Sequence, residues 1–145
     1  MEDLINKKMF KIMSVLSQYE IIWDMKTECE IPRTENLYNG LEKFINIEEW
    51  VREYYSFYKK WLYEDAICIY DISSSINQMM INAIIAYNDS NGNKLLYWFD
   101  VDRDIDEQFK WKLCPLSGTE LIQLGDDYHP NNRLISSVYP LVFPG

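Results

Sequence analysis

The chain has 145 residues, of which 48% are apolar and 15% aromatic, and it carries a formal net charge of −9. Such a chain can bury roughly two-thirds of its unfolded surface, which excludes a disordered protein and predicts one domain over residues 1–145. The charge argues against binding to nucleic acid or to acidic lipids, because their phosphates would be repelled and no basic patch stands out. A membrane span needs about 18–20 consecutive apolar residues, and the sequence has no such run.

The cysteines and the N-terminal residues bear on the cellular compartment. Cys29, Cys68 and Cys114 form an odd, widely spaced set, which is typical of free thiols in a reducing compartment. The first residues place acids before lysines and contain no long apolar stretch, so we expect no export signal. These features predict a cytoplasmic protein.

The first third of the chain predicts a helix, a strand and a second, short helix. Residues 2–18 have their apolar side chains at helical spacing, and residues 23–31 alternate strictly between apolar and charged or polar side chains. The alternation is typical of a half-buried strand, which Pro32 would end. Thr34 is then placed to cap a short helix that runs to about Phe44.

The clearest helix is predicted over residues 47–63. Asn46 is a favourable N-cap, Glu49 completes a capping box, and Ile45 and Trp50 are placed for a hydrophobic staple. A stripe of aromatic side chains lies within about 100° of arc and is expected to cover one face of a sheet. Its members are Trp50, Tyr54, Phe57, Tyr58 and Trp61.

The middle of the chain predicts an antiparallel meander over residues 66–102. Residues 66–73 have the composition of a central strand, and residues 80–88 and 94–102 flank a turn-forming cluster, which predicts a hairpin. Residues 75–88 also show helical spacing, with Ser75 as a cap. We favour the strand because β-branched residues crowd positions 81–85. The predicted fold is α+β, with an antiparallel sheet packed by amphipathic helices.

The last third gives weaker signals. Residues 109–113 are expected to form a short strand, and residues 119–124 either a strand or a helical turn. Residues 129–132 are expected to be a loop. The C-terminal segment is predicted to be extended, because Pro140 and Pro144 are incompatible with a helix.

An acidic run at residues 100–107 is the first candidate for function. It contains five acids and one arginine, a net −4; the acids are Asp100, Asp102, Asp104, Asp106 and Glu107. A calcium loop is rejected, because Ile105 and Trp111 stand where glycine and glutamate are required. Two interpretations remain: a solvated strand end whose acids prevent edge pairing, or a patch that meets a basic partner.

The aromatic side chains and the absence of catalytic motifs also bear on function. Most aromatics are assigned to the core, but Tyr63 and Trp98 are suspected of exposure, where they could anchor a partner. His129 is the single histidine, no metal-ligand spacing occurs, and neither a nucleophile elbow nor a glycine-rich phosphate loop is present. We therefore expect no enzyme, no metal and no cofactor.

A family resemblance extends over residues 46–102. The aromatic helix NIEEWVREYYSFYKKWL, the strand-like AICIYDI and then IIAYNDSNGNKLLYWFDV follow in an order that resembles immunity proteins of bacterial contact-dependent growth inhibition systems. Proteins of this kind are small, cytoplasmic, often acidic α+β domains that block one toxin. The resemblance implies that this chain neutralises a cognate toxin, often a nuclease, by binding at or near its active site.

The residues and the resemblance lead to one hypothesis with two rivals. The chain is expected to bind a basic toxin domain through the acidic run, Trp98 and Tyr63, without nucleic acid or membrane as a partner. One rival is an inhibitor from a phage or mobile element that acts on a host defence enzyme. The other is a small enzyme or ligand-binding domain, which a pocket with perturbed acids would favour over a flat acidic face.

Overall fold

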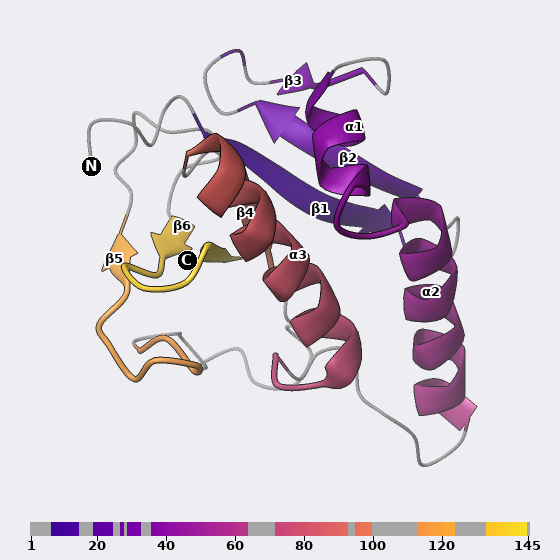
Figure 1. Cartoon of the computed structure of the whole chain (residues 1–145). Coiled ribbons are helices and arrows are strands. Elements are labelled where there is room, and N and C mark those ends of the chain that lie inside the picture. The colour runs from indigo at the N-terminus through magenta and orange to yellow at the C-terminus, as the bar shows by residue number, and fades with distance from the viewer. Residues whose placement is uncertain are drawn as a thin grey trace.

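A computed structural model describes residues 7–14, 19–24, 27, 29–32, 36–63, 72–92, 95–99, 113–123 and 133–144. Within these ranges, ten elements follow one another (Figure 1). They are β1 (Lys8–Ser14), β2 (Tyr19–Asp24), β3 (Cys29–Glu30), α1 (Asn36–Glu42), α2 (Ile47–Tyr63), α3 (Ser75–Asn91), β4 (Leu95–Trp98), β5 (Ile122–Gln123), β6 (Arg133–Ile135) and β7 (Leu141–Pro144).

The strands form one seven-stranded mixed sheet, which confirms the α+β class. Their order is β3-β2-β1-β4-β7-β6-β5. The pairs β1–β4 and β4–β7 are parallel, and the other four pairs are antiparallel. Strand β4 therefore lies between two strands that come from opposite ends of the sequence.

Side chains alternate between the two faces of the sheet and form two apolar clusters. Phe10 and Tyr97 point to the face that packs against all three helices, where α3 crosses in front of β4 (Figure 1). Met9 and Trp98 point to the other face, together with Leu96 and Val142. All four residues of β4 are buried, as expected for a central strand with both faces covered.

The main core joins the helices to the sheet through aromatic rings and buried hydrogen bonds. The ring of Trp50 on α2 lies 5.7 Å from that of Phe10 and 6.2 Å from that of Tyr97. Its indole Nε1–H donates to the carbonyl oxygen of Ile76 at 2.9 Å. The hydroxyl of Tyr97 donates to Oδ1 of Asn77 at 2.7 Å. One aromatic side chain thus connects α2, α3 and β1.

The predicted helices over 34–44 and 47–63 are confirmed as α1 and α2. Asn46 caps α2 as expected, since its Oδ1 accepts the backbone N–H of Glu49 at 3.0 Å. The extended C-terminal segment is confirmed as β7, and the strand alternative for 119–124 is confirmed by β5. These signals were local, which is why they could be recognised in the sequence.

The prediction of a helix over residues 2–18 is wrong, because residues 8–14 form β1. Strand β1 pairs with β2 on one side and β4 on the other. A strand buried on both faces loses the polar–apolar alternation that distinguishes it from a helix. The prediction of one strand over 23–31 is also wrong: the chain reverses, and Asp24 pairs with Cys29 in antiparallel register.

The predicted hairpin of 80–88 with 94–102 is wrong, and its helical alternative is correct. Residues 75–91 form α3, which packs its apolar side on the sheet. Burial of that side outweighs the strand preference of its isoleucines. The turn-forming cluster instead ends the helix, and Gly92 follows with φ of 78°, a conformation that glycine adopts without strain.

Other predicted elements lie partly or wholly outside the described residues. Of the predicted strand 66–73, only Ile72 and Ser73 are described, and they form a turn. Of the predicted strand 109–113, only Leu113 is described, and it makes a single β-bridge with Glu120. The loop 129–132 is not among the described residues.

Within the described ranges, no helix has the length and apolar character needed to cross a bilayer.

Candidate functional site

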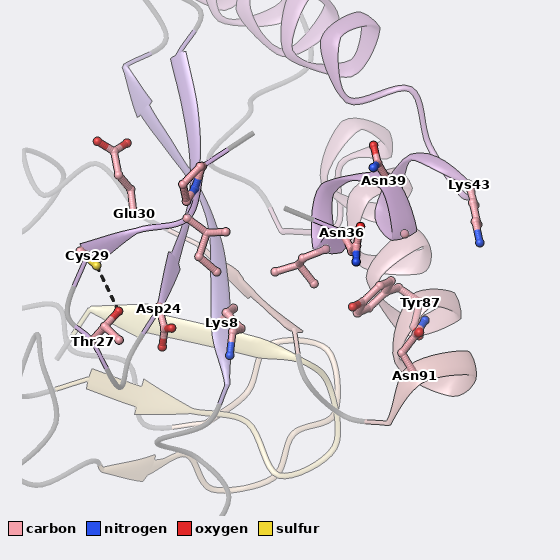
Figure 2. A pocket seen from close by; sticks show the side chains of 14 residues that line it. Lys8, Asp24, Thr27, Cys29, Glu30, Asn36, Asn39, Lys43, Tyr87 and Asn91 are labelled. Carbon is pink, nitrogen blue, oxygen red and sulfur yellow. Dashed lines mark hydrogen bonds between the residues drawn. The ribbon is translucent and has the colours of Figure 1, made fainter. Parts of the chain in front are cut away.

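An open cleft of about 710 Å³ lies at one end of the sheet. One wall comes from β1, β2 and β3, and the other from α1 and the last turns of α3 (Figure 2). Its volume is in the range that holds small ligands in proteins, about 300–1,000 Å³. The lining residues are mostly polar, and the two walls differ in chemistry.

Helix α1 is held against the core so that its polar side faces the cleft. Tyr38 and Leu41 are buried, and the hydroxyl of Tyr38 accepts the backbone N–H of Ile22 at 2.9 Å. Asn36, Asn39 and Lys43 all line the cleft. Asn36 and Asn39 belong to α1, and Lys43 directly follows its last residue.

A glycine permits the close contact between α1 and α3 beside the cleft. A Cβ atom on Gly40 would lie only 2.8 Å from Cε2 of Tyr87, which is shorter than a van der Waals contact. Tyr87 also lines the cleft. Burial raises the pKa of its hydroxyl, so the side chain is neutral at physiological pH.

The strand wall carries charges of both signs. Lys8 on β1 lies opposite Asp24 on β2 in the antiparallel register, and Glu30 on β3 lines the same cleft. Thr27 Oγ1 and Cys29 Sγ are 3.1 Å apart and hydrogen-bonded. Lys43 lies on the opposite wall. Glu30 pairs with Trp23, so its side chain points away from the face that carries Lys8 and Asp24 (Figure 2).

The described residues also contain a second, smaller cavity and a buried thiol. A pocket of about 230 Å³ lies between the end of α3 and the loop from Ser136 to Pro140. Cys114 is a buried free thiol. Burial raises its pKa, but hydrogen bonds from Ser117 and Ser136, and from the backbone of Leu116 and Ser117, outweigh burial and lower it overall.

The structure tests only part of the predicted binding set. Asp100, Asp102, Asp104, Asp106 and Glu107 lie outside the described residues, and so does the side chain of Tyr63, the last residue of α2. Trp98 is described, and its predicted exposure is wrong: the side chain is 5% exposed. It is buried because β4 is a central strand, and Lys11 Nζ lies 4.8 Å from the centre of its ring.

The cleft residues were missed in the sequence, although one signal was present. Asn36, Asn39 and Lys43 are polar residues within the helix that the sequence predicted to end at about Phe44. The other wall could not be foreseen, because Lys8 was assigned to a helix and Cys29 and Asp24 to a single strand. Among the described residues, no group of three His, Cys, Asp or Glu side chains is arranged to hold a metal ion.

The chain matches no protein-family model, and comparison with curated proteins and with solved structures finds no match either. The function proposed below therefore rests on the charge of this chain and the geometry of its described surfaces.

Proposed function

We propose that the protein is a non-enzymatic inhibitor that binds and neutralises a basic toxin domain, as an immunity protein of a contact-dependent growth inhibition system does. The observation that carries this proposal is the charge: 23 acidic residues against 14 basic ones, a net −9. A nuclease toxin must hold phosphate and is therefore basic at its active site. An acidic protein is attracted to that surface and competes with nucleic acid for it.

The described surface supports this proposal. Helix α2 buries Trp50 and Tyr54 and exposes Glu48, Glu49 and Glu53. Asp89 at the end of α3 and Glu120 are exposed as well. Carboxylates held in water at the surface are available for long-range attraction, whereas buried ones would be neutralised by local partners.

We also propose where the protein acts and which of its residues contact the partner. The protein acts in the cytoplasm, where a delivered toxin would reach its target, and it needs no cofactor. The partner is expected to contact the acidic run at 100–107. An inhibitor carried by a mobile element and directed at a host enzyme would use the same electrostatic attraction to a basic partner. The identity of the partner, toxin or host enzyme, decides between the two proposals.

Co-expression tests the proposal directly. The chain is expressed with the C-terminal domain encoded immediately upstream of its gene, and cell survival and recovery of a 1:1 complex are scored. Survival together with a complex is expected. Death of the cells without a complex would overturn the cognate-toxin proposal.

The effect of where the acidic residues lie can be measured separately from the effect of the net charge. Replacing Asp100, Asp102, Asp104, Asp106 and Glu107 by their amides changes the net charge from −9 to −4. We expect association with the toxin domain to slow by about tenfold at low salt and to lose most of its salt dependence, since steering depends on charge near the interface. Stopped-flow fluorescence over a salt series measures both.

The matched control removes five exposed acids elsewhere and reaches the same net charge. These are Glu48, Glu49, Glu53, Asp89 and Glu120. The control is expected to lose less of the association rate than the variant at 100–107, because its acids add only to the overall attraction and not to the proposed binding region. Equal losses in the two variants would show that the run at 100–107 is not the binding region.

A further inference from the structure

We propose that Asn91 is a site of spontaneous hydrolytic deamidation, and that the packing of α1 against α3 protects a second reactive asparagine, Asn39, from the same reaction. Asn39 and Asn91 are the two asparagines of the chain that are followed by glycine. Both are exposed and line the cleft, one on α1 and the other at the end of α3 (Figure 2). The proposal is independent of toxin binding.

An asparagine that precedes glycine is chemically labile, because the glycine nitrogen can attack the asparagine side chain. The backbone nitrogen loses its proton to hydroxide and bonds to Cγ, the bond from Cγ to Nδ2 breaks, and ammonia leaves with a proton from water. Water then opens the cyclic imide at either of its carbonyls and gives aspartate or isoaspartate. Glycine favours the attack, since it has no Cβ to obstruct the approach of its nitrogen. The net reaction exchanges water for ammonia and needs no oxidant or reductant.

A helical backbone prevents this attack. In a helix, each amide N–H lies along the axis and donates to the carbonyl one turn back, so its nitrogen is not presented to the preceding side chain. The ψ angle of the asparagine has to leave its helical value before the nitrogen and Cγ come within reaction distance. The rate at each asparagine therefore depends on how often the backbone around it opens, and not on the exposure of its side chain alone.

The backbone at Asn39 is held firmly by the core. Asn39 lies inside α1, which buries Tyr38 and Leu41. A Cβ atom on Gly40 would lie only 2.8 Å from Cε2 of Tyr87, so the backbone that carries the attacking nitrogen touches the ring directly. Opening of this backbone requires α1 to leave the core.

The backbone at Asn91 is held much more weakly. Asn91 is the last residue of α3, and Gly92 follows with φ of 78°. Residues 89–92 are all exposed, so burial does not fix this turn. The amide Nδ2 of Asn91 donates to the carbonyl oxygen of Tyr87 at 2.9 Å, but a neutral hydrogen bond contributes little net free energy where water competes for it. Helix ends of this kind open at low cost in free energy.

The reaction changes the end of α3 and the wall of the cleft. A carboxylate at position 91 has no N–H to donate to the carbonyl of Tyr87. It also adds negative charge where the last carbonyls of the helix already carry partial negative charge. The last turn of α3 is therefore expected to open further after deamidation, and the cleft gains an anionic group.

Mass spectrometry of the ageing protein tests the proposal. The purified chain is incubated at mildly alkaline pH, both folded and unfolded in guanidinium chloride, and the products are located by digestion and fragmentation. A sample digested at zero time corrects for deamidation during preparation. The ratio of the unfolded to the folded rate gives the protection of each asparagine. We expect Asn39 to be protected at least about tenfold more than Asn91, because release of α1 costs more free energy than opening of a helix end.

Equal protection at the two asparagines, or greater protection at Asn91, would overturn the proposal. So would a folded chain that forms neither aspartate nor isoaspartate at position 91 during a period in which the unfolded chain reacts at both asparagines.

Substitutions assign the reaction to its residue and test the protecting contact. Asn91→Gln keeps an amide donor but needs a larger ring that forms more slowly, so the product should disappear, whereas the matched Asn39→Gln should leave the rate at Asn91 unchanged. Persistence of the same mass change in Asn91→Gln would overturn the assignment. Tyr87→Leu removes the ring that touches Gly40 and should speed the reaction at Asn39. An unchanged rate at Asn39 in this variant, verified as folded by thermal melting, would overturn the proposed protection.

The effect on the end of α3 is tested with Asn91→Asp, which carries the carboxylate of the product from the start. The backbone amides at 89–92 should exchange with deuterium faster than in the unchanged chain, as measured by mass spectrometry. The matched control, Asn82→Asp, adds the same charge at an exposed position within α3 and should leave exchange at 89–92 unchanged. Equal exchange in all three proteins would overturn the proposed opening of the last turn.

Discussion

The aromatic core and the cleft beside α1 both contain many polar atoms, but they use them in opposite ways. In the core, the indole of Trp50 donates to a carbonyl of α3, Tyr97 donates to Asn77, and Asn77 donates to Ser74. In the cleft, Asn36 and Asn39 extend exposed amides from α1.

This difference decides which polar groups contribute to stability. A buried polar group has to be hydrogen-bonded, since leaving one unpaired costs about 1–3 kcal/mol. Polar atoms in the core therefore specify how α2, α3 and the sheet fit together. Exposed amides contribute little to stability, because water replaces their partners. Substitutions in the core should lower the free energy of unfolding, and substitutions of the exposed amides in the cleft should leave it nearly unchanged.

The largest effect is expected from Trp50→Ala. The variant removes ring contacts with Phe10, Tyr54 and Tyr97 and leaves a cavity. The free energy of unfolding should fall by about 3–5 kcal/mol, measured by urea denaturation. Trp50→Phe keeps most of the ring volume and should lose less. A loss below 1 kcal/mol in Trp50→Ala would show that this ring is not the centre of the core.

A smaller effect, with a pH signature, is expected from Tyr97→Phe. Loss of the bond to Asn77 should lower the free energy of unfolding by about 1–3 kcal/mol at neutral pH. Burial, and secondarily Tyr54, raises the pKa of Tyr97 well above its ordinary value of 10.0. The buried hydroxyl is thus neutral, and the stability it contributes is complete below that value and is lost as the pH rises beyond it.

The unchanged chain should therefore lose stability above pH 10.0 more steeply than Tyr97→Phe does. The difference approaches about 1.4 kcal/mol per pH unit for one proton. Urea denaturation on both sides of that pH measures it. Parallel pH profiles for the two proteins would contradict the assignment of a buried, neutral Tyr97.

The smallest effect is expected where the core meets the cleft, at Gly40. Gly40→Ala places a methyl group against the ring of Tyr87. The strain costs about 1–3 kcal/mol, and the better helix propensity of alanine returns up to about 1 kcal/mol. A net loss of about 1–2 kcal/mol is expected by thermal and urea denaturation.

The contact itself can be tested with a second substitution. In a Tyr87→Leu background the ring is absent, so Gly40→Ala should cost less than it does in the unchanged chain. An equal cost in both backgrounds would mean that α1 is not held against α3 through this contact.

The sequence predicted the elements whose signals lie within a few neighbouring residues. Helix α2 has a cap at Asn46 and a clear division between aromatic and charged sides, and both are read without knowledge of the rest of the chain. Prediction from the sequence failed for β1 and α3, because both are apolar on more than one side. For such segments, periodicity does not distinguish a buried strand from a buried helix.

The candidate site was predicted only in part for a related reason. Asn36, Asn39 and Lys43 could be placed within one predicted helix. Their proximity to Asp24, Glu30 and Tyr87 depends on four elements, α1, β2, β3 and α3, that meet only after folding. Trp98 illustrates the same limit, because its burial follows from the position of β4 between β1 and β7.

The amino-acid sequence by itself determined the α+β class, the helices α1 and α2, and the negative charge from which the partner's chemistry is inferred. Only the tertiary structure decided the path of the sheet, the identity of α3 and the existence of the cleft. Pairing between distant strands and burial of one side of α3 remove a large apolar surface from water. The free energy gained in this way outweighs local preferences of a few tenths of a kcal/mol per residue.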